Sequence, residues 1–229
     1  MFAMNVSVPI VITIDGPSGS GKGTLSQMLA RHLNYHLLDS GALYRLVALA
    51  AIKKGVELGD EQAISKLAEG LDVRFSLENG ESAQILLEDE DVAGAIRQEV
   101  VGMAASRIAA YSEVRAALLE RQRAFAVAPG LIADGRDMGT TVFPDAQVKL
   151  FLTASAEARA ERRYKQLWAK GETVEMSELI KDIRERDERD SNRSISPLKP
   201  ALDAVIIDST ALSIDEVFTK MLAAITLKS

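Results

Sequence analysis

The chain has 229 residues, of which 47% are apolar and 26% are charged, a balance typical of a globular protein with a sizeable α/β core. Its net charge of −6 argues against a general nucleic-acid binder, whose surface is normally basic. There are no cysteines, which excludes disulfides, thiolate metal sites and cysteine nucleophiles, and only two histidines, His32 and His36, are present.

The N-terminal stretch MFAMNVSVPIVITIDG is apolar but contains no lysine or arginine, and its apolar run is too short to span a bilayer. It leads directly into a glycine-rich loop, which a cleaved signal peptide would not do. We therefore expect a cytoplasmic protein with no membrane segment and no nucleic-acid partner.

Residues 9–15 (PIVITID) form a nearly continuous β-branched run, typical of a parallel strand buried on both faces. Over residues 25–33 apolar side chains recur at helical spacing. This spacing predicts an amphipathic helix that ends near Asn34 and buries His32 on its apolar face. Residues 35–39 (YHLLD) are expected to form a second strand.

Three later apolar runs end in aspartate or turn residues, and they are GLIADG (130–135), VKLFLTAS (148–155) and AVIIDST (204–210). Helical patterns separate these runs. The alternation predicts an α/β fold, with a five-stranded parallel sheet and helices on both of its faces, in a single domain over residues 1–229.

One segment departs from this alternation. Residues 71–92 (LDVRFSLENGESAQILLEDEDV) contain two strand-like runs on either side of Asn79-Gly80, the strongest short signal for a β-hairpin. A helical pattern follows over residues 111–127. We therefore expect an antiparallel hairpin separate from the main sheet, in a small lobe inserted at residues 60–110.

Residues 16–24 (GPSGSGKGT) lie between the first strand and the first helix, where a phosphate-binding loop is expected. Each of the loop's glycines permits a positive-φ turn that directs backbone N–H groups inward, and the helix N-terminus adds partial positive charge. The residues expected to bind ATP are Gly16, Pro17, Ser18, Gly19, Ser20, Gly21, Lys22, Gly23 and Thr24, with Lys22 reaching the β and γ phosphates. The alternative is a glycine-rich turn that binds no ligand.

The hydroxyl residue of the usual loop pattern is displaced by one position, since Gly23 stands where it belongs and Thr24 follows. This GKGT form is found in nucleoside-monophosphate kinases of the adenylate kinase type, where the threonine hydroxyl faces Mg²⁺. The N-K-x-D sequence of GTPases and the LSGGQ-like segment of ABC-type ATPases do not occur. The loop therefore predicts phosphoryl transfer to a small molecule, with ATP and Mg²⁺ as cofactors.

Three further motifs are LLDSGALYR (37–45), LIADGRDMGTTVFPDA (131–146) and IRERDERDSNRSISPL (183–198). Together with the loop, they resemble those of the bacterial cytidylate kinases. The resemblance covers nearly the whole chain and includes the inserted hairpin lobe, which adenylate kinases lack. It implies a P-loop kinase fold of the nucleoside-monophosphate kinase type, a lid at residues 159–185, a monomer, and transfer of the γ-phosphoryl group of ATP to CMP or dCMP in pyrimidine metabolism.

The resemblance also implies which side chains bind CMP, and these are Ser40, Tyr44, Arg45, Ser106, Arg115, Arg136, Asp137, Arg186, Asp190 and Arg193. Asp137 would accept a hydrogen bond from the cytosine amine and would repel the carbonyl group that uracil presents there. Arg186 and Asp190, on the continuation of an inward helical stripe, would hold the ribose. The acceptor phosphate would be bound by Ser40, Arg45, Arg136 and Arg193, with Tyr44 alongside.

The resemblance alone assigns Ser106 and Arg115 to the base, because from the sequence itself both look structural and Arg115 looks like a surface residue. It also places a donor-side arginine in the lid, for which Arg162 is chosen. Asp134 ends an apolar run, a position from which it and Thr24 could hold Mg²⁺ beside the loop.

The residues expected to act in phosphoryl transfer are Lys22, Arg136, Asp137, Arg186 and Arg193. No general base is needed, because a phosphate monoester, with a second pKa of ~6, is already ionised at neutral pH. Several alternatives stay open: Ser40 could cap a helix, Arg136 could form an ion pair within a tight turn, and the charged helix could be solvated. The acceptor could be UMP, AMP or shikimate, or ATP could act as a switch without transfer.

Overall fold

The computed structural model describes residues 9–76, 84–169 and 171–228, and the chain packs as two compact units. Unit 1 combines Met1–Asp39 with Gln122–Ser229, and unit 2 is Ser40–Arg121. The lobe predicted at residues 60–110 falls within unit 2, and its boundaries and nucleotide-binding role stay a prediction.

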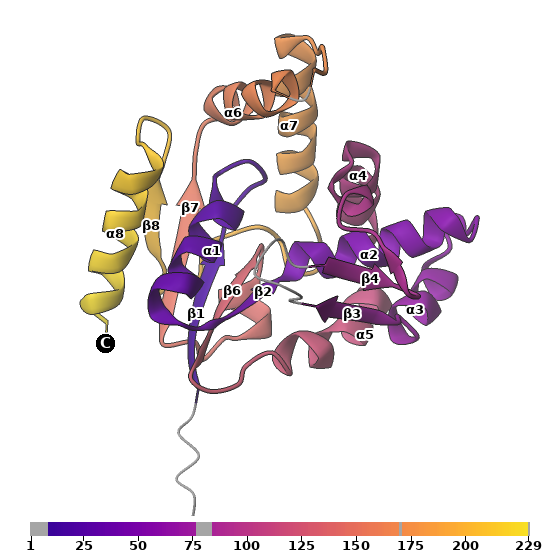
Figure 1. Ribbon diagram of the computed structural model, residues 1–229, viewed down its shortest axis with the longest axis horizontal. Coiled ribbons are helices and arrows are strands. Elements are labelled where there is room, and N and C mark those ends of the chain that lie inside the picture. Colours follow the sequence, from indigo (N-terminus) through magenta and orange to yellow (C-terminus); the bar gives the residue numbers. More distant parts are fainter. Residues whose placement is uncertain (1–8, 77–83, 170, 229) are drawn as a thin grey trace, which may run out of the picture. The chain divides into compact units, whose positions relative to one another are not determined.

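Unit 1 is built on a five-stranded parallel sheet in the order β2-β6-β1-β7-β8 (Figure 1). Its strands are β1 (Ile10–Asp15), β2 (His36–Asp39), β6 (Gly130–Gly135), β7 (Val148–Thr153) and β8 (Val205–Asp208). Its helices are α1 (Lys22–Leu33), α6 (Ala156–Trp168), α7 (Met176–Ser191) and α8 (Ile214–Thr226). The five strands predicted from the apolar runs are all present, which confirms the predicted parallel sheet.

Both faces of this sheet are covered. Helices α1 and α8 pack on one face, where Ile12, Leu29 and Met221 belong to a single apolar core. On the opposite face Thr13 is fully buried, and the helical turn η3 (Met138–Val142) contacts β1. Burial on both faces explains why the strands are nearly continuous apolar runs.

Helix α1 ends where the sequence predicts, because Asn34 adopts a left-handed conformation with φ 54° that stops the helix. The prediction that His32 is buried is wrong: its ring is exposed and lies edge-on to Phe218 of α8 at 5.7 Å between centroids. The buried stripe of α1 runs through Leu25 and Leu29, and His32 lies at the margin of that stripe.

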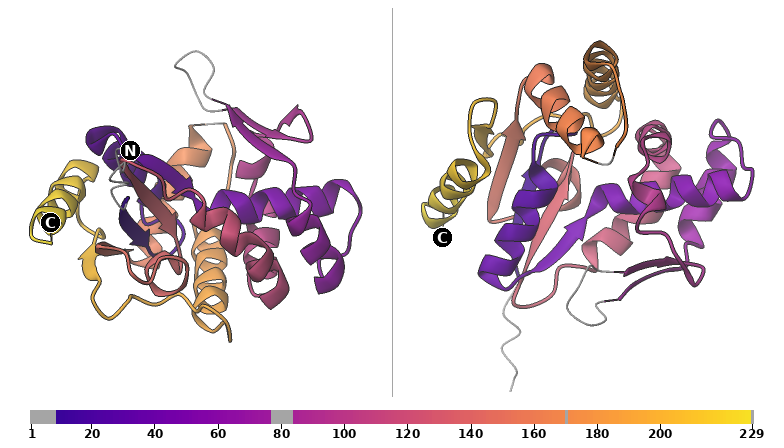
Figure 2. Two further views of the ribbon diagram at one scale, coloured as in Figure 1. Left: turned by 90° about the horizontal axis from the view of Figure 1, so that it is seen from below. Right: turned by 45° about the horizontal axis from the view of Figure 1, so that its top comes forward.

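Unit 2 contains the second sheet, which is antiparallel and has the order β3-β4-β5 (Figure 2, purple to magenta). Its strands are β3 (Val73–Ser76), β4 (Gln84–Leu87) and β5 (Glu90–Asp91). The predicted antiparallel hairpin is confirmed by the pairing of β3 with β4, whereas its Asn79-Gly80 turn lies outside the described residues. The third strand was not predicted.

The helices of unit 2 are α2 (Ser40–Lys53), α3 (Glu61–Glu69), α4 (Glu99–Ile108) and α5 (Ser112–Arg123), with a short 3₁₀ helix η2 (Ala95–Arg97) before α4. Helix α2 is buried along most of its length and packs against α3 and α4, as expected for a helix in the middle of a small unit. In the part of the chain that the structure describes, no helix combines the length and the apolar character needed to cross a bilayer.

Candidate active site

The glycine-rich loop joins the central strand β1 to the first residue of α1. Gly16, Gly19 and Gly21 have the expected positive φ values, which are 149°, 76° and 95°. At Gly23 the expected positive φ is wrong, because this residue already lies in the first turn of α1. A Cβ atom on Gly16 would lie 1.9 Å from the carbonyl oxygen of Leu152 on β7, so a larger residue does not fit. Because Gly21 has no side chain to cap α1, the first N–H groups of the helix remain available to an anion.

Lys22 begins α1 and is buried, with its Nζ 2.9 Å from the carbonyl oxygen of Pro17, to which it donates. The same Nζ lies 4.0 Å from Oδ1 of Asp134, which is near the end of β6. Burial, together with the positive charge of Arg136, lowers the pKa of Lys22 to about 8. Burial raises the pKa of Asp134 and the nearby ammonium group of Lys22 opposes this shift. A bound phosphate anion would favour the charged form of Lys22.

Gly23, at the position where the usual loop has its hydroxyl residue, lies beside Asp134. A Cβ atom at this position would lie 3.8 Å from Oδ2 of Asp134, so the usual loop hydroxyl would face this carboxylate, and glycine leaves that space open. Mg²⁺ in kinases is held by one or two carboxylates together with substrate phosphates and water. The carboxylate of Asp134 and the exposed side chain of Thr24 fit this requirement. Among the described residues there is no cluster of three or more metal-ligating side chains.

Asp15, the last residue of β1, is a functional candidate that sequence reasoning missed. Its Oδ1 and Oδ2 accept hydrogen bonds from the backbone amides of Met138 and Gly139, each at 2.8 Å. Burial raises the pKa of Asp15 to about 7, and the two amide donors oppose this rise. The carboxylate therefore fastens the DGRDMGT turn, including the buried Asp137, to the strand that leads into the phosphate loop. The sequence signal that could have identified Asp15 is its position as an acidic residue at the end of a buried apolar strand.

Asp190 of α7 holds two of the predicted phosphate-binding arginines. It is 2% exposed, and its Oδ2 accepts from Nε of Arg136 at 3.1 Å while its Oδ1 accepts from Arg193. Of these three groups, two are cationic and one is anionic, so together they carry a net positive charge. Arg186 lies one turn earlier on α7 and is half-buried. Unit 1 therefore brings these four predicted residues to one end of α7.

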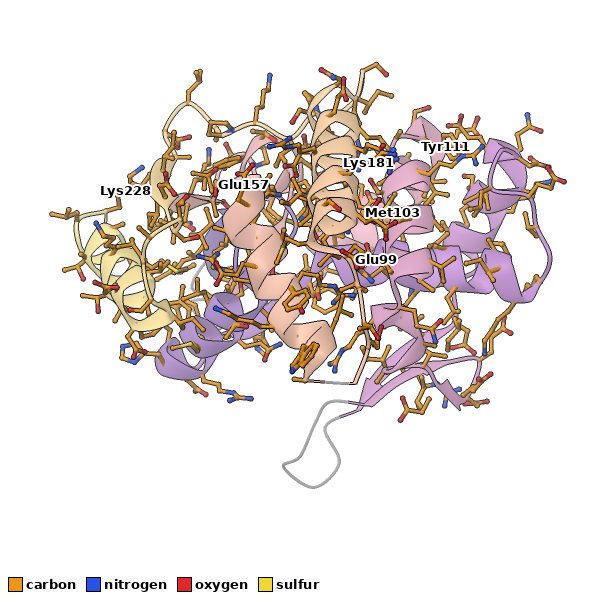
Figure 3. The ribbon with its side chains drawn as sticks, turned by 90° about the horizontal axis from the view of Figure 1, so that it is seen from above. Glu99, Met103, Tyr111, Glu157, Lys181 and Lys228 are labelled. Carbon is orange, nitrogen blue, oxygen red and sulfur yellow. The ribbon has the colours of Figure 1, made fainter. Side chains whose placement is uncertain are left out.

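Two arginines of α6, Arg159 and Arg162, contact backbone carbonyl groups of the phosphate loop. Helices α6 and α7 run side by side and are marked in Figure 3 by Glu157 and Lys181. Arg162 donates to the carbonyl oxygen of Ser20 at 3.3 Å and to Oγ of Ser209 at 3.1 Å. Arg159 is buried, donates to the carbonyl oxygen of Ser18 at 3.2 Å and forms an ion pair with Asp187. Both side chains brace the loop, and a contact of Arg162 with the donor nucleotide stays a prediction.

The remaining predicted substrate residues belong to unit 2. Arg115 is 8% exposed, donates to the carbonyl oxygen of Ala109 at 3.2 Å, and has its guanidinium 5.9 Å from the ring centre of Tyr44. The surface position that its sequence context suggested is therefore wrong, because the fold covers this face of α5. Ser40 and Ser106 are also buried. Arg45 donates from Nη1 to the carbonyl oxygen of Ile96 at 2.7 Å.

The central strand of a parallel sheet runs through a glycine-rich loop into a helix, with a buried lysine and an acid beside the loop, and these features define a P-loop phosphotransferase. The family model described as "Cytidylate kinase" matches residues 12–227. The chain is 62% identical to a cytidylate kinase of Aeromonas hydrophila over 93% of its own length and 92% of the relative. It is 56% identical to one of Aliivibrio salmonicida over 98% of its length and 100% of the relative. The chain therefore belongs to the cytidylate kinase family, which confirms the resemblance.

Proposed function

We propose that the protein transfers the γ-phosphoryl group of ATP to CMP or dCMP, giving ADP and CDP or dCDP. The observation that carries this proposal is a phosphate loop with Lys22 buried beside Asp134, in a chain that matches the cytidylate kinase family over residues 12–227. The alternative acceptors AMP, UMP and shikimate are less well supported, since the relatives over almost the full length are cytidylate kinases.

Binding of the donor is proposed to use the open N-terminus of α1 and the ammonium group of Lys22. The side chains proposed to hold Mg²⁺ are those of Asp134 and Thr24, and the ion would supply positive charge to the phosphates that are separated during transfer. Arg162 is proposed to contact the donor from the lid. With Arg159 it also holds the carbonyl groups of Ser18 and Ser20 and so maintains the shape of the loop.

Binding of the acceptor is proposed to use Arg45, Arg136 and Arg193 for the phosphate, with Ser40 and Tyr44 nearby in the chain. Asp190 supports this role by holding two of the guanidinium groups of unit 1 through opposite oxygens. Arg186 and Asp190 would hold the ribose, Asp137 would accept from the cytosine amine, and Ser106 and Arg115 would contact the base. These residue roles are proposals that rest on the family motifs.

The chemical step needs positioning and charge neutralisation more than proton transfer. The acceptor phosphate, with a second pKa of ~6, is a competent nucleophile at neutral pH without a general base. Cationic side chains are therefore the groups expected to control the rate.

We also propose that the enzyme is a cytoplasmic monomer, as the sequence predicts.

The test is ADP formation from ATP with CMP, dCMP, UMP and AMP offered separately. We expect turnover with CMP and dCMP, weak turnover with UMP and AMP, and loss of turnover in Lys22→Met, which excludes a contaminating kinase. Binding of ATP without acceptor-stimulated turnover would support the alternative of a nucleotide-dependent switch and contradict the proposal.

A further inference from the structure

Gly102 lies inside helix α4, immediately before Met103, which is labelled in Figure 3. A glycine in a helix interior costs about 1 kcal/mol relative to alanine. The backbone does not require glycine here, since Gly102 is not among the described residues with positive φ and has an ordinary helical conformation. The reason for a glycine must therefore lie in what the helix contacts.

The contact is the guanidinium group of Arg45 on α2. A Cβ atom at position 102 would lie 2.8 Å from Nη2, 3.1 Å from Cζ and 3.1 Å from Nη1 of Arg45. The guanidinium group is thus pressed against the bare backbone of α4. Its Nη1 also donates a hydrogen bond to the carbonyl oxygen of Ile96, at 2.7 Å. Both contacts lie within unit 2, where α2 packs against α4.

We propose that Gly102 is a positioning residue for the acceptor: its lack of a side chain lets the Arg45 guanidinium occupy the orientation in which it binds the phosphate of CMP. This inference rests on the proposed function, in which Arg45 contacts that phosphate. A methyl group at 102 would displace the flexible end of Arg45 and leave the helix intact, because an arginine head group moves more easily than packed backbone. Recognition by a guanidinium depends on the direction of its N–H groups, so a small displacement weakens phosphate binding.

The direct test compares Gly102→Ala with Gly94→Ala in the full chain. Gly94 belongs to the same unit, has φ −75°, and has no atom within 4 Å of an added Cβ, so its substitution is a matched control. We expect Gly102→Ala to raise the KM for CMP by about 10-fold to 100-fold, with little change in the KM for ATP. The melting temperature should be unchanged or higher, and Gly94→Ala should keep both KM values.

A double-mutant cycle with Arg45→Ala separates this role from a general effect on packing. If Gly102 acts through Arg45, adding Gly102→Ala to Arg45→Ala produces no further rise in the KM for CMP. An unchanged KM in Gly102→Ala, or an equal rise with and without Arg45, would overturn the inference.

The same experiments distinguish the two proposals. If Arg45→Ala raises the KM for CMP and Gly102→Ala does not, the proposed function stands and only the role of Gly102 fails. If the wild-type protein does not phosphorylate CMP, or if Arg45→Ala keeps the wild-type KM, the acceptor assignment fails and the inference fails with it.

Discussion

Asp190 accepts a hydrogen bond from Nε of Arg136 at 3.1 Å, although the two residues are 54 positions apart in the sequence. The carboxylate is 2% exposed and also pairs with Arg193, so it compensates two cations in a largely buried place. Under the proposed function, in which Arg136 and Arg193 bind the acceptor phosphate, substrate binding and stability of the fold are linked at this group.

Replacing Asp190 with asparagine should lower the free energy of unfolding by about 3–5 kcal/mol, because it leaves buried guanidinium groups without their counter-charge. Denaturant unfolding measures this change. The control is Glu161→Gln, which removes an exposed ion pair with Lys165 on α6 and should change the free energy of unfolding far less. Equal stability of the two variants would show that Asp190 is not the electrostatic centre of this group.

Replacing Arg136 or Arg193 with alanine should slow turnover with CMP by about 10³-fold, because the acceptor phosphate then lacks a cation that offsets its repulsion from ATP. The measurement is kcat from ADP formation, with thermal unfolding to confirm that each variant is folded. Arg184→Ala is the control on the same helix, since Arg184 is exposed and pairs with Glu157 at 2.5 Å. Near wild-type kcat in Arg136→Ala or Arg193→Ala would contradict the proposed arrangement.

Binding of ATP near pH 8 should take up protons. In the free protein the pKa of Lys22 is lowered to about 8, so this side chain is only partly charged at that pH. Phosphate beside the ammonium group favours its charged form and raises the pKa, so protons move from solvent to protein. Calorimetric titrations in two buffers of different ionisation enthalpy measure the uptake. It should be absent in Lys22→Met, and proton release by the wild-type protein would contradict the prediction.

Replacing Asp15 with asparagine should reduce kcat/KM for CMP by at least about 10-fold. Asparagine offers one oxygen to the amides of Met138 and Gly139 and turns an NH₂ group toward the other, so the turn that carries Arg136 moves. Asp208→Asn is the control, because this exposed acid also ends a strand but accepts from Thr210 two residues away. An unchanged kcat/KM for CMP would show that the clamp does not position the acceptor side.

Most of the architecture could be predicted from the sequence because its signals are local. The β-branched run before the loop, the helical spacing up to Asn34 and the hairpin at residues 71–92 all depend on neighbouring residues. The phosphate loop could also be predicted from the sequence, since strand, glycines, lysine and helix follow one another directly. The expectation of a positive φ at Gly23 was wrong, because the sequence does not show at which residue the helix begins.

The sequence by itself determined the five strands of the parallel sheet, the hairpin, the phosphate loop and the family, because these depend on periodicity and on motifs of adjacent residues. Only the tertiary structure decided that Arg115 is buried, that Asp15 holds the turn before Met138, and that Gly102 makes room for Arg45. Such relationships join residues that are distant in the chain. A side chain's burial and hydrogen-bond partners depend on which elements pack against it, and no local pattern contains that information.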